Sequence, residues 1–438
     1  MRIGKTPLQA RQLTLIILSA YLAIGLNVYD DYGVHWDEGM NQNYSRFLVT
    51  YFKKILQLED TAGVRINGNP YHIYDHGPFP ELPLGIMVDY LNNGSQRDLI
   101  LFRHLSTFLL FFISAVFFSK LLTDNFRETS IPAIGLLLYI LHPRIFSHSF
   151  YNTTDITLLA FFTISLYTAG RCFKNPSKTN LILHSVVSAL TVDARLVGLI
   201  VPASTSLLMF LMRVLRADGC RHTMKKITVY LVLTGFLSLL FWPTVWDNPG
   251  RIRTSFNVSV SNFREATPWY YNLKYFILTT PLATTLLFMA GLLSITYSIR
   301  KLDEKLGEGF ILDFHVLSII LVSMALPVIF RTFLFDFWRH HFFVYSSIVY
   351  VCVSGLRGLK SFMDLLGDKV WNVFLALLFL SYLPALHFMV TVHPNQQIYG
   401  NILTFNGKNQ LKEFGAIDHF GLSYMQGIRY ILDNRPGK

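Results

Sequence analysis

Long apolar segments recur along the whole chain and alternate with short polar ones. A helix of about 20 apolar residues crosses the hydrocarbon core of a bilayer. The pattern predicts about eleven such helices, centred near residues 20, 110, 139, 161, 187, 206, 234, 286, 321, 349 and 380. The fifth and sixth are short and meet at Asp193-Ala194-Arg195. The predicted fold class is therefore an all-α polytopic membrane protein.

A polar stretch, Asp30–Glu38, follows the first apolar segment, and four of its nine residues are carboxylates. An apolar stripe at helical spacing comes next and predicts a helix that lies in the membrane interface. The stripe consists of Met40, Tyr44, Phe47, Leu48, Tyr51, Phe52, Ile55 and Leu56, and Asn41, Gln42, Ser45, Arg46 and Lys53 are predicted to point away from it. Asp37 and Glu38 would lie at its N-terminus, where free N–H groups and the helix dipole favour a charged carboxylate.

The composition supports a membrane protein. The chain of 438 residues is 52% hydrophobic and only 15% charged, whereas soluble proteins carry about 25% charged residues. The first span, Leu13–Val28, lacks a small-residue cleavage site, so we expect a retained helix and not a signal peptide. Three scattered cysteines, Cys172, Cys220 and Cys352, predict no disulfide and no metal site of Cys/His type. No basic run with interleaved aromatic residues indicates a nucleic-acid partner.

Basic residues predict the topology. If the N-terminus is cytoplasmic, the basic loops fall on the same side, as the positive-inside rule requires. Much of the net charge of +11 then reflects this bias and is weak evidence for an anionic partner. The outer side receives a first loop, residues 30–97, a long loop, residues 244–272, and the tail, residues 393–438, next to a transmembrane domain of residues 1–392. Acids, arginines and histidines gather on this outer side, at span ends, which favours catalysis at an interface over transport through the spans.

Two carboxylate positions are candidates for catalysis. Asp37, with Glu38, has the position of a general base that takes a proton from an acceptor hydroxyl at headgroup height. Asp155 begins the fourth span and emerges on the same face. The alternative for both is structural, because aspartate is also a good N-cap residue. The two aspartates could instead hold a hard divalent cation.

Cations on the same face are candidates for binding a phosphate, which arginine holds in bidentate fashion. The candidates are Arg339, His340, His341, Arg195 and Arg103. A single arginine could equally be an interfacial anchor, and Asp193 could simply pair with Arg195. Asp75 and His76 in the first outer loop and Trp246 in the long one are candidates for binding sugar or acceptor, although aromatic residues near Trp246 fit an interfacial belt as well.

The residues resemble one known family. An Asp-Glu pair in the first outer loop is similar to the motif of the GT-C membrane glycosyltransferases, in the polyprenyl- or dolichyl-phosphate mannosyltransferase-like branch that includes the aminoarabinose transferases. Further matching stretches are His76–Phe79, Ser147–Asp155, Asp193–Leu199, Trp269–Tyr271, Phe337–His341 and His393–Asn401. The resemblance runs along nearly the whole chain.

The resemblance implies a GT-C fold, a polyprenyl-phosphate sugar donor and inversion at the anomeric carbon. It implies that Asp37 is the catalytic base, that the second-loop aspartate is Asp155, and that no metal or other cofactor is needed. Arg195 stands where many members have lysine. The large outer C-terminal domain of some members is not found here, which predicts a simpler acceptor, a lipid-linked or surface glycan.

The expected location is a bacterial inner membrane, where the lipids surround the spans and the active site faces the periplasm. Two alternatives from other classes remain open. One is a transporter or flippase for polyprenyl-linked precursors, and the other is a non-catalytic subunit of a glycan-assembly complex.

Overall fold

The computed structural model describes residues 8–57, 77–90, 95–126, 128, 130–216, 220–260, 267–300, 308–404 and 418–434. Among these residues the regular elements are all helices. The α-helices are α1 (Leu8–Val28), α2 (Glu38–Ile55), α3 (Glu81–Tyr90), α4 (Gln96–Asn125), α5 (Ser130–Ile140), α6 (Pro143–Tyr151), α7 (Thr153–Lys174), α8 (Lys178–Ala194), α9 (Ile200–Arg216), α10 (Cys220–Phe241), α11 (Thr244–Asp247), α12 (Gly250–Val260), α13 (Tyr271–Thr279), α14 (Leu282–Arg300), α15 (Glu308–Ile329), α16 (Tyr345–Met363), α17 (Asp368–Thr391) and α18 (Tyr424–Asn434). Short 3-10 helices are η2 (Leu196–Leu199), η3 (Arg339–Val344), η4 (Gln396–Ile398) and η5 (Ile402–Thr404).

Nine helices of the described chain are long and apolar enough to cross a membrane. They are α1, α4, α7, η2 continued by α9, α10, α14, α15, η3 continued by α16, and α17. A tenth candidate is the pair α5 and α6, which is bent by 60°. Pro143 explains the bend. The residue before a proline avoids helical backbone, which ends α5, and proline is favoured at the first position of a new helix, which starts α6. Together with the 17-residue α8, these helices lie where the eleven apolar segments predict them, and the multi-pass all-helical fold is confirmed.

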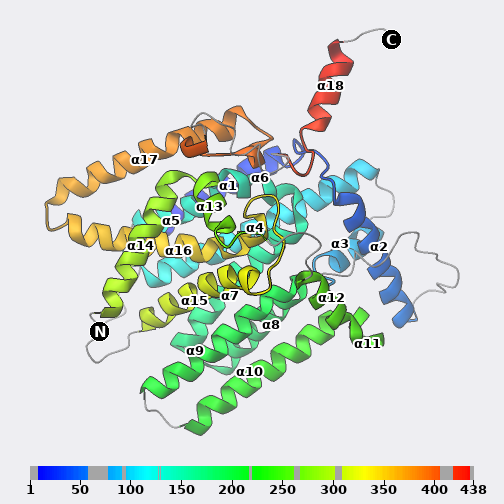
Figure 1. Ribbon diagram of the computed structural model, residues 1–438, viewed down its shortest axis with the longest axis horizontal. Coiled ribbons are helices and arrows are strands. Elements are labelled where there is room, and N and C mark those ends of the chain that lie inside the picture. Colours follow the sequence, from blue (N-terminus) through cyan, green and yellow to red (C-terminus); the bar gives the residue numbers. More distant parts are fainter. Residues whose placement is uncertain are drawn as a thin grey trace.

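The helices differ in how deeply they are buried. Most residues of α7 and α16 are buried, so these two form the centre of the domain, while α10 and α17 leave most of their surface free for lipid. In Figure 1 the long helices run roughly side by side, and α2, α3, α11 and α12 gather at one end of the bundle. The helices of the first loop and of the long loop, which were predicted to share one side of the membrane, therefore lie at the same end of the bundle.

The amphipathic helix predicted after Glu38 is present as α2, but its buried face differs from the predicted stripe. Tyr44 and Leu48 are buried as expected, whereas Met40 and Leu56 are exposed. Ser45, predicted to point away, is buried and donates a hydrogen bond to Glu81. The reason is that α3 packs against this face, and a polar contact between the two helices replaces part of the apolar stripe.

Candidate active site

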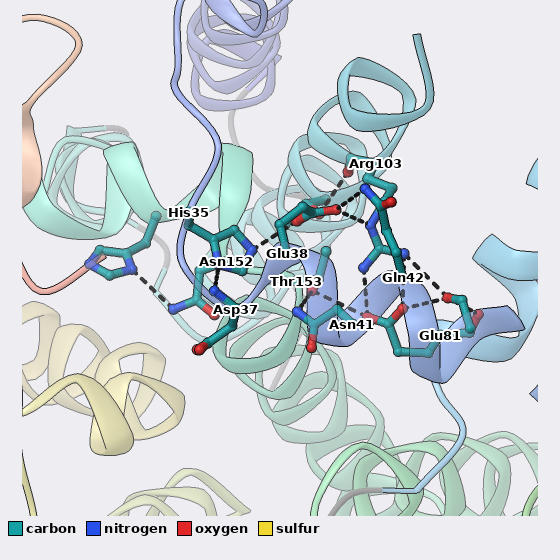
Figure 2. A network of polar contacts seen from close by, with 12 residues as sticks. His35, Asp37, Glu38, Asn41, Gln42, Glu81, Arg103, Asn152 and Thr153 are labelled. Atoms are coloured by element: carbon teal, nitrogen blue, oxygen red, sulfur yellow. Dashed lines mark hydrogen bonds and ion pairs between the residues drawn. The ribbon is translucent and has the colours of Figure 1, made fainter. Parts of the chain in front are cut away.

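A buried ion-pair network anchors the start of α2 (Figure 2). Glu38 in α2 and Glu81 in α3 both bind Arg103, which comes from α4. Arg103 Nε lies 2.5 Å from Glu38 Oε1, and its two Nη atoms donate to the two carboxylate oxygens of Glu81 at 2.9 and 2.8 Å. Glu38 and Arg103 are each only 1% exposed. Each charge lies beside an opposite charge, which a buried ion needs because it has lost its water.

Glu38 also binds a histidine on its other side. His35 Nε2 lies 2.8 Å from Glu38 Oε2. Burial alone would raise the pKa of Glu38, but the hydrogen bond from His35 and the charge of Arg103 outweigh it and lower the pKa to about 2. Since the folded pKa lies below the ordinary value of 4.5, this carboxylate adds stability at neutral pH that is lost as pH falls through about 2.

Asp37 behaves differently from its neighbour. It stands just before α2, and its half-buried carboxylate makes no hydrogen bond or ion pair within the described part of the chain. It does not cap the helix, because its backbone is already helical and the side chain accepts no N–H. In Figure 2 the carboxylate points away from Glu38 and Arg103. The sequence left open that Asp37 is only an N-cap, and the geometry does not support that role.

A second cluster surrounds Asp155 in the first turn of α7. Asn152 is the N-cap and accepts from the Asp155 N–H at 3.1 Å, and its amide donates back to Asp155 at 2.9 Å. Arg195 Nη1 lies 2.9 Å from one Asp155 oxygen, and Arg339 Nη1 lies 3.3 Å from the other. Asp155 thus lies together with two of the arginines that were predicted to share its face. The proposed pairing of Arg195 with Asp193 is wrong, because Arg195 pairs with Asp155.

The two clusters meet at the start of α7. Thr153 lies between them, and its hydroxyl donates to Glu81 at 3.4 Å and accepts from Asn41 at 3.4 Å. Figure 2 shows Asn152 and Thr153 beside Asp37 and Glu81. One helix start thus joins the network under Asp37 to the arginines around Asp155.

Asp336 holds two arginines together beside Asp155. Its carboxylate lies 2.9 Å from Arg339 Nε and 3.6 Å from Arg144 Nη2. Asp336 and Phe337 have φ values of 54° and 58°, a left-handed region that costs energy for residues other than glycine. Such strain persists where the surroundings fix it and is common at functional sites. Arg144 Nη1 is buried and has no hydrogen-bond partner among the described residues.

The remaining predicted site residues are more scattered. His341 contacts the carbonyl of Ser323 at 3.1 Å, and the ring of His340 packs against Phe335. Trp246 is 44% exposed and donates to the carbonyl of Leu239 at 2.7 Å. Asp75 and His76 lie outside the described residues. No group of three potential metal ligands occurs among the residues that the structure describes.

The end of the chain covers this region. Trp36 N–H donates to the carbonyl of Phe420 at 3.1 Å, and the guanidinium of Arg339 lies 4.6 Å from the Phe420 ring centre. Gln397 links Ser147 to Asp418, at 3.1 and 3.2 Å. These contacts attach the tail to the cluster of arginines.

Four residues of this region were missed as site residues by the sequence reading. They are His35, Glu81, Arg144 and Asp336. Glu81 follows a proline and looks like an ordinary first residue of a helix. Asp336 lies three residues before Arg339, and this spacing, which allows an ion pair within one turn, was the one available signal in the sequence. Arg103 was predicted to bind phosphate, but the structure commits its guanidinium to Glu38 and Glu81.

The segment that leads into α3 makes a close contact at Gly77. A Cβ on Gly77 would lie 1.9 Å from the Asp193 carbonyl oxygen and 2.2 Å from its Oδ1. We expect Gly77→Ala to lower the stability by about 1–3 kcal/mol, because overpacking forces backbone shifts. A Cβ on Gly39 would meet nothing within 4 Å, so Gly39→Ala is the matched control and should be neutral or slightly stabilising. Apparent melting temperatures in detergent measure both, and equal effects would contradict the prediction.

The fold was compared with known proteins. No family model matches the chain, and no curated protein is similar to it in sequence. Among solved structures, ArnT from Cupriavidus metallidurans bound to undecaprenyl phosphate is 15% identical with a TM-score of 0.56, over 87% of this chain and 67% of that one. The apo state of that protein is 14% identical with a TM-score of 0.53, over 77% of this chain and 59% of that one.

An archaeal oligosaccharyltransferase, AglB from Archaeoglobus fulgidus, in complex with an inhibitory peptide and a dolichol-phosphate, is also similar. It is 15% identical with a TM-score of 0.57, over 88% of this chain and 57% of that one. This chain therefore spans roughly three fifths of the length of the proteins it matches. The chain therefore shares the fold of these polytopic membrane proteins, which is the fold that the resemblance in the motifs implies.

Proposed function

We propose that this protein is an inverting membrane glycosyltransferase that moves a sugar from a polyprenyl-phosphate donor to an acceptor hydroxyl. The observation that carries the proposal is the contrast among the carboxylates of the site. Glu38, Glu81, Asp155 and Asp336 are all paired with arginines, whereas the Asp37 carboxylate has no partner in the described chain. A general base needs that freedom, because it must accept a proton from a substrate.

The chemistry then divides between the two clusters. Asp37 takes the proton from the acceptor hydroxyl, whose oxygen forms a bond to the anomeric carbon while the bond to the donor phosphate oxygen breaks. The polyprenyl phosphate leaves with that electron pair and one more negative charge. Arg339 and Arg195 stabilise it, since arginine suits phosphate oxygens. His340, His341, Asp75, His76 and Trp246 stay predictions for binding donor and acceptor. Arg103 acts through Glu38 and Glu81 and not on the phosphate.

Two structural neighbours carry ligands that fit this donor class, undecaprenyl phosphate in ArnT and dolichol-phosphate in AglB. We therefore infer a polyprenyl-phosphate sugar as donor and a lipid-linked or surface glycan as acceptor. Mass spectrometry of polyprenyl-phosphate sugars and surface glycans, in cells with and without the protein, tests this function. We expect the donor to accumulate and one glycan to lose a sugar when the protein is absent. Transport of an unmodified precursor, with no change in glycan mass, would favour the flippase alternative.

The side of the membrane is tested by labelling. We expect a cysteine placed at Trp269 to react with an impermeant maleimide in intact cells, because the basic loops put this end outside. A cysteine at Leu365, in the turn between α16 and α17, should react only after lysis. Both native side chains are exposed, so the comparison reports sidedness and not burial. The reverse pattern would put the active site on the cytoplasmic side.

Arg339→Lys tests the phosphate role. Lysine keeps the charge but loses the fork that reaches Asp336 and Asp155, so we expect weaker donor binding and slower turnover. A lost hydrogen bond to a charged group costs about 1.5–3 kcal/mol, which corresponds to a loss in kcat/KM of about tenfold to 150-fold. Arg357→Lys, far along α16, is the control and should leave both constants unchanged. If Arg339→Ala kept wild-type donor affinity and turnover, Arg339 would not bind the phosphate and would be only an interfacial anchor.

A further inference from the structure

The two ring nitrogens of His35 face partners that require opposite roles. His35 Nδ1 lies 3.1 Å from the backbone nitrogen of Asp37, which can only donate. His35 Nε2 lies 2.8 Å from a carboxylate oxygen of Glu38, which accepts when ionised. A neutral imidazole has one acceptor and one donor nitrogen. The neighbours therefore select one form of His35, neutral and with its proton on Nε2.

The surroundings of His35 hold the ring in place. It is buried, and the rings of Phe420 from the tail and Tyr151 from α6 pack against it at 5.2 and 6.1 Å. The titratable groups that act on it are Glu38 from α2, Arg103 behind Glu38, His104 from α4, and His148 and Tyr151 from α6. Glu38 is the only carboxylate among these groups.

A rigid chain of contacts thus ends on the backbone of Asp37. Glu81 fixes Arg103 through two hydrogen bonds, Arg103 fixes Glu38, and Glu38 fixes His35. His35 then accepts the N–H of Asp37. The Asp37 carboxylate has no side-chain partner of its own within the described residues, so its position depends on its backbone. Two contacts hold this backbone: His35 Nδ1 accepts the Asp37 N–H, and the Asp37 carbonyl accepts the Asn41 N–H.

We propose that His35 is a positioning residue of the site: its Nδ1 accepts the N–H of Asp37 and so fixes the backbone of Asp37 for proton transfer. This inference rests on the proposed function.

Two substitutions separate the two contacts of His35. Asparagine places its amide oxygen where Nδ1 lies, so His35→Asn keeps the acceptor for Asp37 N–H and cannot be protonated. Glutamine places its amide near Nε2, so His35→Gln keeps the donor to Glu38 and loses the hold on Asp37. His35→Ala loses both contacts. A purely structural histidine would make the Asn and Gln variants equivalent.

We expect His35→Asn to retain kcat within about threefold at pH 8, and His35→Gln and His35→Ala to lose about 10- to 100-fold in kcat, because misplacement by about 1 Å costs up to about 10²-fold. The donor KM should change little, since the lost contact affects the transition state. Purified full-length protein with a synthetic polyprenyl-phosphate sugar and a membrane glycan extract is the assay.

Hydrogen exchange supplies a readout that does not need activity. The amide of Asp37, followed by mass spectrometry in a peptide that contains it, should exchange faster in His35→Gln and His35→Ala than in His35→Asn and the wild type. Equal exchange and equal kcat in the Asn and Gln variants would overturn the role of His35. Slow exchange in the wild type without any sugar transfer would refute the proposed function while leaving the hold on Asp37 in place.

Discussion

Asp37→Asn should lower turnover by about 10²- to 10⁴-fold, the range that a positioned general base contributes. Asparagine has nearly the same size and shape, but it cannot accept the proton of the acceptor hydroxyl. Donor affinity should change far less, because the lost interaction belongs to the transition state. Initial rates over a range of donor concentrations, with purified protein and a synthetic short-chain polyprenyl-phosphate sugar, separate kcat from KM.

Stability provides the control for this variant. The Asp37 side chain makes no cap hydrogen bond, and asparagine is about as good an N-cap as aspartate, so the melting temperature should stay near that of the wild type. Glu38→Gln is not an equivalent control, since Glu38 binds both Arg103 and His35. Asp37→Asn with more than about half of wild-type turnover would end the assignment of Asp37 as the base.

Arg103→Met should cost about 3–5 kcal/mol of stability, because it leaves Glu38 and Glu81 buried without their countercharge. Methionine keeps much of the volume, so the loss reports the charge and not a cavity. Adding Glu81→Gln should recover part of the loss, since it removes one of the two uncompensated carboxylates. Apparent melting temperatures in detergent, or the midpoint of denaturant unfolding, give the comparison.

Lys360→Met provides a matched test of burial. Lys360 lies 2.7 Å from Asp364, so the contact is as short as those of Arg103, but both side chains are partly exposed. Water screens such a pair, and removing it should cost less than about 1 kcal/mol. If Arg103→Met destabilised the protein no more than Lys360→Met, the network around Arg103 would not stabilise the start of α2.

The sequence alone was sufficient for the fold class and for the position of the main elements. Apolar runs long enough to cross a bilayer define the spans, because each span meets lipid or other spans and must be apolar along its length. The start of α2 at Glu38 also followed from the sequence, since periodicity and charge at a helix start are local properties. Basic loops grouped the acids and arginines at one end of the bundle, and the contacts of Asp155 with Arg195 and Arg339 agree with that grouping.

The pairing of charges at that end was decided by the tertiary structure alone. Arg103 could have bound a phosphate as far as its sequence context indicated, yet α2 and α3 bring Glu38 and Glu81 to it. Arg195 could have paired with Asp193 two residues earlier, but its backbone is extended after the last turn of α8, and it reaches Asp155 in α7. An ion pair forms only when its two groups lie within a few ångströms of each other, and the groups paired here lie far apart in the chain. Helix packing sets those distances. Among the described residues it left the carboxylate of Asp37 without a partner, while it paired Glu38, Glu81, Asp155 and Asp336 with arginines.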